Sequence, residues 1–162
     1  MKVLCTQPRD ELLAAAIPPP GSEDYLLHLM ECLSQARETV DIACPFIDDA
    51  GVTLLAATHD RGSNATWSIC TRTAGSTLRR EATARGWQVF EYRGAPGSAD
   101  RRGFHCKLFV LDASTAVVGS VNLVKANLVE NAEVGLLVDD ERVAAVLGRV
   151  ISGIRRASER VA

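Results

Sequence analysis

Four polar side chains, about two thirds of the way along the chain, have the types and the spacing of a reactive site. His105 and Lys107 are separated by one residue, and so are Ser120 and Asn122. Side chains two positions apart on a strand share a face, so each pair is expected to point the same way from its own strand. Gly119 stands just before the second pair, where a residue without a Cβ lets the backbone come close to a ligand.

One imidazole, one ammonium, one hydroxyl and one carboxamide on a single patch would form a phosphate site. Lys107 would neutralise charge, while Ser120 and Asn122 would donate hydrogen bonds. His105 is the side chain there that is able to act as a nucleophile near neutral pH. Glu133, at the start of the next expected strand, could accept the other ring N–H of His105 and fix its tautomer. The pattern therefore indicates chemistry at a phosphate ester.

The same residues resemble the HxKx4Dx6GSxN signature (HKD motif) of the phospholipase D superfamily. Asp112 and Gly119 complete the pattern, Glu133 resembles the family's downstream acidic position, and residues 40–48 resemble its first strand and turn. The resemblance covers essentially the whole chain and implies one copy of the family fold. Asp112 lies an odd number of residues from Lys107, so we expect it to face away from the site and to hold the turn at the strand end.

The reaction requires a second histidine, because displacement at phosphorus places the attacking group and the leaving oxygen on opposite sides. The chain has three histidines; His28 lies in a helical apolar pattern, His59 lies before a loop, and neither has a lysine at the motif spacing. Short members of the family with one motif pair as symmetric dimers. The resemblance implies a homodimer with a shared active site, in which one His105 forms a phosphohistidine and the other protonates the leaving oxygen.

Neither a cofactor nor a metal is expected. The glycines form no dinucleotide-binding or P-loop pattern, and no His, Cys and Asp cluster has metal-ligand spacing. The lysines would take the charge role of a metal. The cysteines are odd in number and lack CxxC spacing, which favours buried reduced thiols over disulfides or a metal site. They are Cys5, Cys32, Cys44, Cys70 and Cys106.

The elements that must position these groups follow from the order of apolar runs. The expected strands cover residues 40–46, 67–71, 87–92, 104–111, 116–121 and 133–138, and the expected helices cover residues 23–37, 50–59, 76–85 and 141–159. This order predicts an α/β fold with a mixed β-sheet flanked by helices in a layered sandwich. Residues 1–162 suffice for one domain, with residues 1–20 as an N-terminal extension that holds a short helix around residues 9–16.

Positive charge is concentrated next to the motif. Residues 71–107 hold eight basic and three acidic side chains, a net +5, whereas residues 1–70 carry a net −6. A polyanion would be attracted electrostatically to that stretch. For three of its arginines, the solvated face of a helix is an equally good explanation. They are Arg79, Arg80 and Arg85.

The substrate expected from these features is nucleic acid. The short chain, the single motif and the basic stretch favour a nuclease that cleaves DNA or RNA, with little sequence specificity because no recognition helix is evident. Arg101 and Arg102, on the loop before His105, would bind flanking phosphates. Two alternatives stay open. The first is a phospholipid phosphodiesterase or transphosphatidylase, and the second is a non-catalytic nucleic-acid-binding or dimerisation module of a larger complex.

The compartment is predicted from apolar content. No apolar run reaches the ~20 residues that span a membrane. The first residues meet polar and charged side chains too soon to form the core of a signal peptide. Both features predict a cytoplasmic protein.

Overall fold

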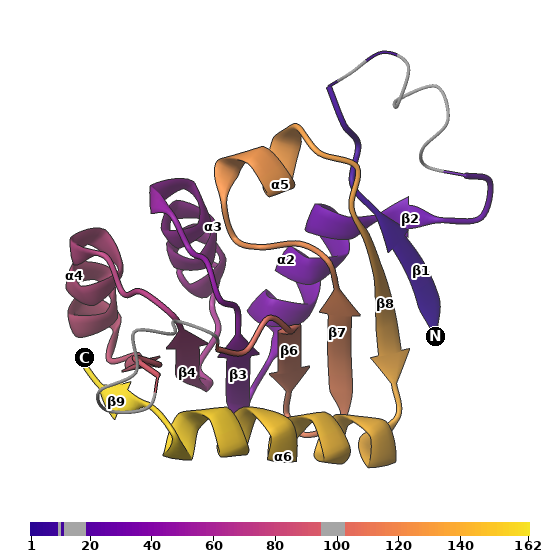
Figure 1. Ribbon diagram of the computed structural model, residues 1–162. Helices are drawn as coiled ribbons and strands as arrows, with labels where there is room; N and C mark the ends of the chain where they lie inside the picture. Colours follow the sequence, from indigo (N-terminus) through magenta and orange to yellow (C-terminus); the bar gives the residue numbers. More distant parts are fainter. Residues whose placement is uncertain (10, 12–18, 95–102) are drawn as a thin grey trace.

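The chain forms one mixed sheet with helices on both faces in a computed structural model that describes residues 1–9, 11, 19–94 and 103–162 (Figure 1). The strands within these residues are β1 Lys2–Cys5, β2 Glu23–Asp24, β3 Thr39–Ala43, β4 Thr66–Thr71, β5 Gln88–Glu91, β6 Lys107–Leu111, β7 Thr115–Gly119, β8 Val134–Asp139 and β9 Glu159–Arg160. The helices are α2 Tyr25–Gln35, α3 Asp49–His59, α4 Ser76–Arg85, α5 Lys125–Val129 and α6 Glu141–Arg156. The order of the strands in the sheet is β2-β1-β8-β7-β6-β3-β4-β5-β9.

The directions of the strands bring several loops to the same edge of the sheet. β3, β4 and β5 run parallel, β6 is antiparallel to β3, and β7 and β8 each reverse direction again. The carboxyl ends of β3, β4, β5 and β7 therefore lie beside the amino ends of β6 and β8. This edge, which we call the upper edge, is drawn uppermost in Figure 1, with α5 above it.

Helices cover both faces of the sheet and enclose two apolar cores. The larger core lies under α2, α3 and α4, which contribute Leu29, Leu33, Leu55 and Leu78, and it includes Ile42, Ile69, Phe109 and Val117 of the strands. The smaller core lies under α6, which crosses the other face (Figure 1), and it comprises Ala43, Cys70, Leu108, Val110, Ala116, Ala144 and Ile151. The alternation of side chains along β6 and β7 supplies both cores at once. The structure confirms the predicted α/β layered fold.

Two features at the ends of elements differ from the sequence prediction. Lys2–Cys5 forms a strand that pairs with β8, where we expected an extension, because four residues are too short a run to show a period. The expected strand 104–111 begins at Lys107, so His105 precedes the strand. Most of the helix predicted around residues 9–16 lies outside the described residues.

Within the described ranges, no helix combines the length and the apolar content that crossing a membrane requires.

Candidate active site

His105 and Lys107 meet at the upper edge, although His105 is not part of the strand. Lys107 opens β6 and is 5% exposed, whereas His105 is exposed to solvent. The Lys107 Nζ lies 3.1 Å from Nδ1 and 3.3 Å from Nε2 of His105, and donates to the His105 carbonyl oxygen at 2.9 Å. An ammonium group is costly to bury without polar partners, and here its partners lie where a ligand can reach them. The pair thus presents a cation and an imidazole on one side of the edge.

Ser120 and Glu133 form a second pair beside the first. The Ser120 Oγ donates to Glu133 Oε2, and Asn127 Nδ2 donates to Oε1 of the same carboxylate. The backbone N–H of Glu133 donates to Thr6 Oγ1 at 2.8 Å. Both oxygens of this buried carboxylate are therefore engaged. Within the described residues they do not contact His105, so the predicted contact between Glu133 and the His105 ring is not made inside one chain.

Strand pairing brings the two pairs together. Lys107 of β6 is directly opposite Gly119 of β7, so the two Cα atoms are roughly 5 Å apart, and Ser120 follows at once. A Cβ on Gly119 would lie 2.8 Å from the Val134 carbonyl oxygen and 2.9 Å from the Tyr25 hydroxyl. Packing against β8 and α2 therefore already excludes a Cβ at this position, and close approach of a ligand there stays a prediction.

Asn122 reaches the site through the segment that follows β7. Leu123 forms an isolated β-bridge with Ile47, and the Leu123 carbonyl oxygen accepts from the Asp48 N–H at 3.0 Å. The segment therefore runs from β7 to the loop after β3. Because β6 lies between these two strands, Asn122 crosses its amino end, where Lys107 begins. The Asn122 Oδ1 is buried and has no hydrogen-bond partner among the described residues. This oxygen is an acceptor, so the group that Asn122 could offer to a phosphate is the Nδ2 of the same carboxamide.

The close approach of that segment depends on Gly51, in the first turn of α3. A Cβ there would lie 2.0 Å from the Leu123 carbonyl oxygen. Asp48 joins the two helices that flank the segment, because its carboxylate accepts from Gly51 N at 3.0 Å and from Lys125 N at 2.8 Å. The position of Asn122 is thus set by backbone packing.

Asp112 lies at the opposite end of β6 and organises backbone. Its carboxylate accepts from the N–H groups of Arg37 at 2.9 Å, Glu38 at 2.8 Å and Thr39 at 2.9 Å, at a turn where its φ is 50°. Burial acts to raise the pKa of Asp112, but these backbone donors outweigh it and hold the pKa below its ordinary value. Its contacts join the end of β6 to the start of β3.

Asp112→Asn is expected to lower the free energy of unfolding by about 1–2 kcal/mol at pH 7, because hydrogen bonds to a charged acceptor are the stronger ones. Asparagine keeps one acceptor oxygen and tolerates the positive φ. A lowered pKa stabilises the fold above the pKa of unfolded aspartate, ~3.9, and the contribution disappears as the pH falls through the lower folded value. Urea denaturation should show a difference between the two proteins that shrinks below about pH 4. An equal difference at pH 3 and pH 7 would contradict this role.

The arginines of α4 are paired within the fold. Arg79 contacts Glu91 at 2.8 Å, Arg80 contacts Glu81 at 3.0 Å, and Arg85 contacts Asp60 at 2.7 Å. For these three the structure favours the ion-paired helix face over phosphate binding. Arg101 and Arg102 lie outside the described residues. Within the described part of the chain, no three His, Cys, Asp or Glu side chains are grouped so as to hold a metal ion.

Sequence spacing did not reveal Asn127, Thr6 or Tyr25. Asn127 of α5 and Thr6, which follows β1, contact Glu133, and Tyr25 of α2 packs against Gly119. No local pattern marks such residues.

Comparison with known proteins gives one family and several similar structures. A family model described as "Cardiolipin synthase, PLD-like domain" matches residues 29–154. No curated protein matches the sequence. Nuc from Salmonella typhimurium, a phospholipase D family member, is 16% identical with a TM-score of 0.68, over 99% of this chain and 96% of its own. NucT from Helicobacter pylori is 18% identical with a TM-score of 0.66, over 84% of this chain and 90% of its own.

A larger protein shares the same fold. Phosphatidylserine synthase from Haemophilus influenzae is 16% identical with a TM-score of 0.65, over 98% of this chain and 39% of its own. At these identities, the structural likeness concerns the fold.

Proposed function

Since the chain belongs to the family of phospholipase D-like domains, we propose that it is a metal-independent phosphodiesterase that cleaves nucleic acid through a phosphohistidine. The observation that carries the proposal is the contact between the buried Lys107 ammonium and both ring nitrogens of the solvent-exposed His105. A phosphate oxygen that takes over the Lys107 hydrogen bond would leave a ring nitrogen free to attack. The cation would then stabilise the charge that builds up on the equatorial oxygens.

The reaction proceeds in two steps. A neutral ring nitrogen of His105 attacks phosphorus, the P–O bond to the leaving group breaks, and a protonated imidazole on the far side donates its proton to the departing oxygen. That second imidazole, now neutral, takes a proton from water, which attacks the phosphohistidine and releases the phosphomonoester. Asn122 would donate to the phosphate, and Ser120 and Glu133 would shape the adjoining wall.

The second imidazole comes from a second copy of the chain, because the other two histidines are engaged elsewhere. His28 of α2 contacts Glu23 and Glu31. His59 of α3 packs edge-on against Trp67 and Trp87, with ring centroids 5.5 and 5.6 Å apart.

Exposed apolar side chains support a surface for that second copy. They are Val143, Val146 and Val150 of α6, Val134 and Leu136 of β8, and Val3 of β1. Alternation along β1 and β8 directs the strand residues to the face that carries α6, because their neighbours Leu4 and Leu137 belong to the core on the other face. Successive residues are about 100° apart around the axis of a helix, so the three valines of α6 lie on a different side of the helix from Arg155. Arg155 contacts Asp41 in the middle of β3. The exposed residues give the face that carries α6 an apolar surface that a second copy could cover. Val134, which opens β8, brings part of that surface to the upper edge, where a twofold axis would bring two His105 side chains together.

A lipid phosphodiesterase is the second candidate, favoured by the description of the family and by the fold shared with phosphatidylserine synthase. Arg79, Arg80 and Arg85 of the basic stretch are ion-paired. The preference for nucleic acid over lipid therefore rests on Arg72 and Lys107, which lie at the upper edge. A third candidate, a module that binds nucleic acid without cleaving it, would leave the exposed His105 without a role.

Incubation of the protein with labelled DNA, RNA and phosphatidylcholine in EDTA tests the proposal. We expect cleavage of nucleic acid and none of the lipid. Cleavage of phosphatidylcholine in preference to nucleic acid would establish the second candidate, and salt-sensitive binding of DNA without turnover would establish the third. Loss of activity in EDTA that added metal restores would overturn the metal-independent mechanism.

A further inference from the structure

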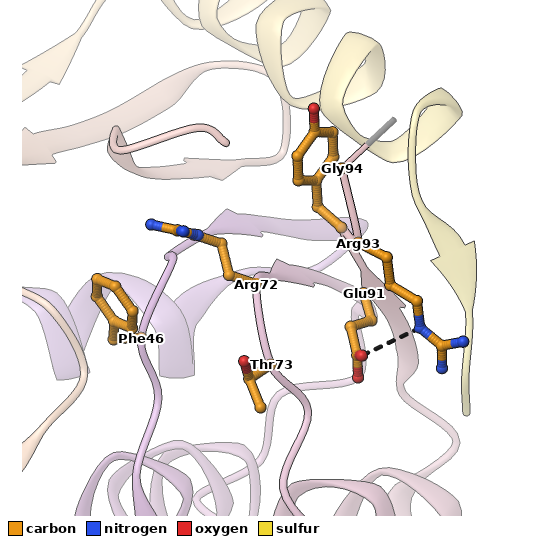
Figure 2. Close-up of a pocket in the computed structure, with 7 residues that line it drawn as sticks. Phe46, Arg72, Thr73, Glu91, Arg93 and Gly94 are labelled. Atoms are coloured by element: carbon orange, nitrogen blue, oxygen red, sulfur yellow. Dashed lines mark hydrogen bonds and ion pairs between the residues drawn. The ribbon is translucent and has the colours of Figure 1, made fainter. Parts of the chain in front are cut away.

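A cavity of about 470 Å³ adjoins His105 at the upper edge and takes no part in the mechanism above. It is formed by the residues that follow β3, β4 and β5, and Figure 2 shows Phe46 and Arg72 on one side of it and Glu91 and Arg93 on the other. Its lining residues are Phe46, Arg72, Thr73, Glu91, Tyr92, Arg93 and Gly94.

Phe46 is shared between this cavity and the catalytic histidine. Its ring lies edge-on to His105, with centroids 6.5 Å apart and an interplanar angle of 70°. The Arg72 guanidinium lies 5.3 Å from its centroid. Phe46 as a whole residue is nevertheless 43% exposed, so a large hydrophobic side chain is open to solvent beside His105. The Phe46 ring and the Arg72 guanidinium therefore lie together next to His105.

The opposite wall combines aromatic surface with balanced charge. Tyr92 packs edge-on against Phe104, with ring centroids 6.3 Å apart. Glu91 contacts Arg79 at 2.8 Å and Arg93 at 3.2 Å, so its carboxylate is compensated by two guanidinium groups. Arg93 also forms an ion pair with Glu159 at 2.9 Å. The charges of this wall balance, with Arg79 and Arg93 against Glu91 and Glu159. Arg72 lies with Phe46 on the other wall, so the lining offers a flat ligand aromatic surface beside an arginine.

We propose that this cavity holds one unpaired nucleobase next to the scissile phosphate, an inference that rests on the nucleic-acid substrate proposed above. Its volume lies within the roughly 300–1,000 Å³ of small-ligand pockets. Aromatic rings beside basic groups are the means by which proteins bind single strands without reading sequence. A base inside a duplex is covered by its neighbours on both faces, so the cavity binds unpaired bases of single strands.

The test follows cleavage at each linkage of an end-labelled single strand of ten thymidines. A second strand carries one abasic residue at its centre. Wild type is expected to cut a linkage next to the abasic residue roughly 5- to 100-fold more slowly than the same linkage in the intact strand. Phe46→Leu, which keeps apolar bulk beside His105 but has no aromatic face, should slow cleavage of the intact strand by a similar factor. In that variant the abasic residue should make no further difference, and Phe46→Trp should restore the wild-type pattern.

Two results would overturn the subsite while leaving the proposed function standing. One is equal cleavage by wild type at intact and abasic linkages. The other is a Phe46→Leu protein that still cuts the abasic linkage selectively slowly, which would show that Phe46 acts through His105 alone. If wild type cuts neither strand, nor any longer DNA or RNA, the proposed function itself fails.

Discussion

His105→Ala is expected to lower the rate of phosphodiester hydrolysis by about 10⁴-fold or more, because the substitution removes both the nucleophile and the general acid of the shared site. The side chain is exposed, and the His105 carbonyl oxygen still accepts from the buried Lys107 ammonium after truncation, so the fold is expected to be retained. Initial rates on single-stranded DNA, at matched protein concentration, measure the effect.

His28→Gln provides a matched control. It removes another partly exposed histidine, whose contacts are with Glu23 and Glu31 of its own neighbourhood. We expect its activity to stay within about twofold of wild type, with an unfolding midpoint like that of His105→Ala. Retention of more than one hundredth of wild-type activity by the folded His105→Ala protein would remove His105 from the mechanism.

The order of elements and the motif could be predicted from the sequence because both are local properties. Alternation of side chains and helical spacing indicate strands and helices within windows of about ten residues, and the positions of His105, Lys107 and Asn122 follow from spacing alone. Their meeting at one edge follows from the directions of β6 and β7, which a hairpin-length connection makes antiparallel.

The full set of Glu133 partners could not be predicted, because Thr6 is 127 residues away along the chain. Asn127, Thr6 and Ser120 come from α5, the residue after β1 and the residue after β7. The pairing of β1 with β8 is not visible in the sequence, because the first strand has four residues and no period. Contact between Glu133 and a histidine was a reasonable expectation from residue type, but the buried carboxylate already accepts from two side chains.

Gly119 shows what a motif position leaves open. Its place in the motif predicts close approach of a ligand, and the structure adds close approach of Val134 and Tyr25. A glycine in a sequence indicates only that a Cβ is excluded. Which atoms exclude it is decided by tertiary packing.

A heterodimer with one working histidine tests the central claim, that two chains complete one site, most directly. Wild type and His105→Ala chains that carry different affinity tags are coexpressed, and the mixed dimer is purified through both tags. A shared site then has either the nucleophile or the general acid, but never both. The loss of general acid catalysis alone is expected to lower the rate by about 10²–10⁴-fold.

The measurement is the hydrolysis rate of single-stranded DNA by that heterodimer, compared with a wild-type dimer purified through the same two tags. We predict that the heterodimer has less than about one hundredth of the wild-type rate. A heterodimer with half of the wild-type rate would show that each chain acts alone, and would contradict the shared site.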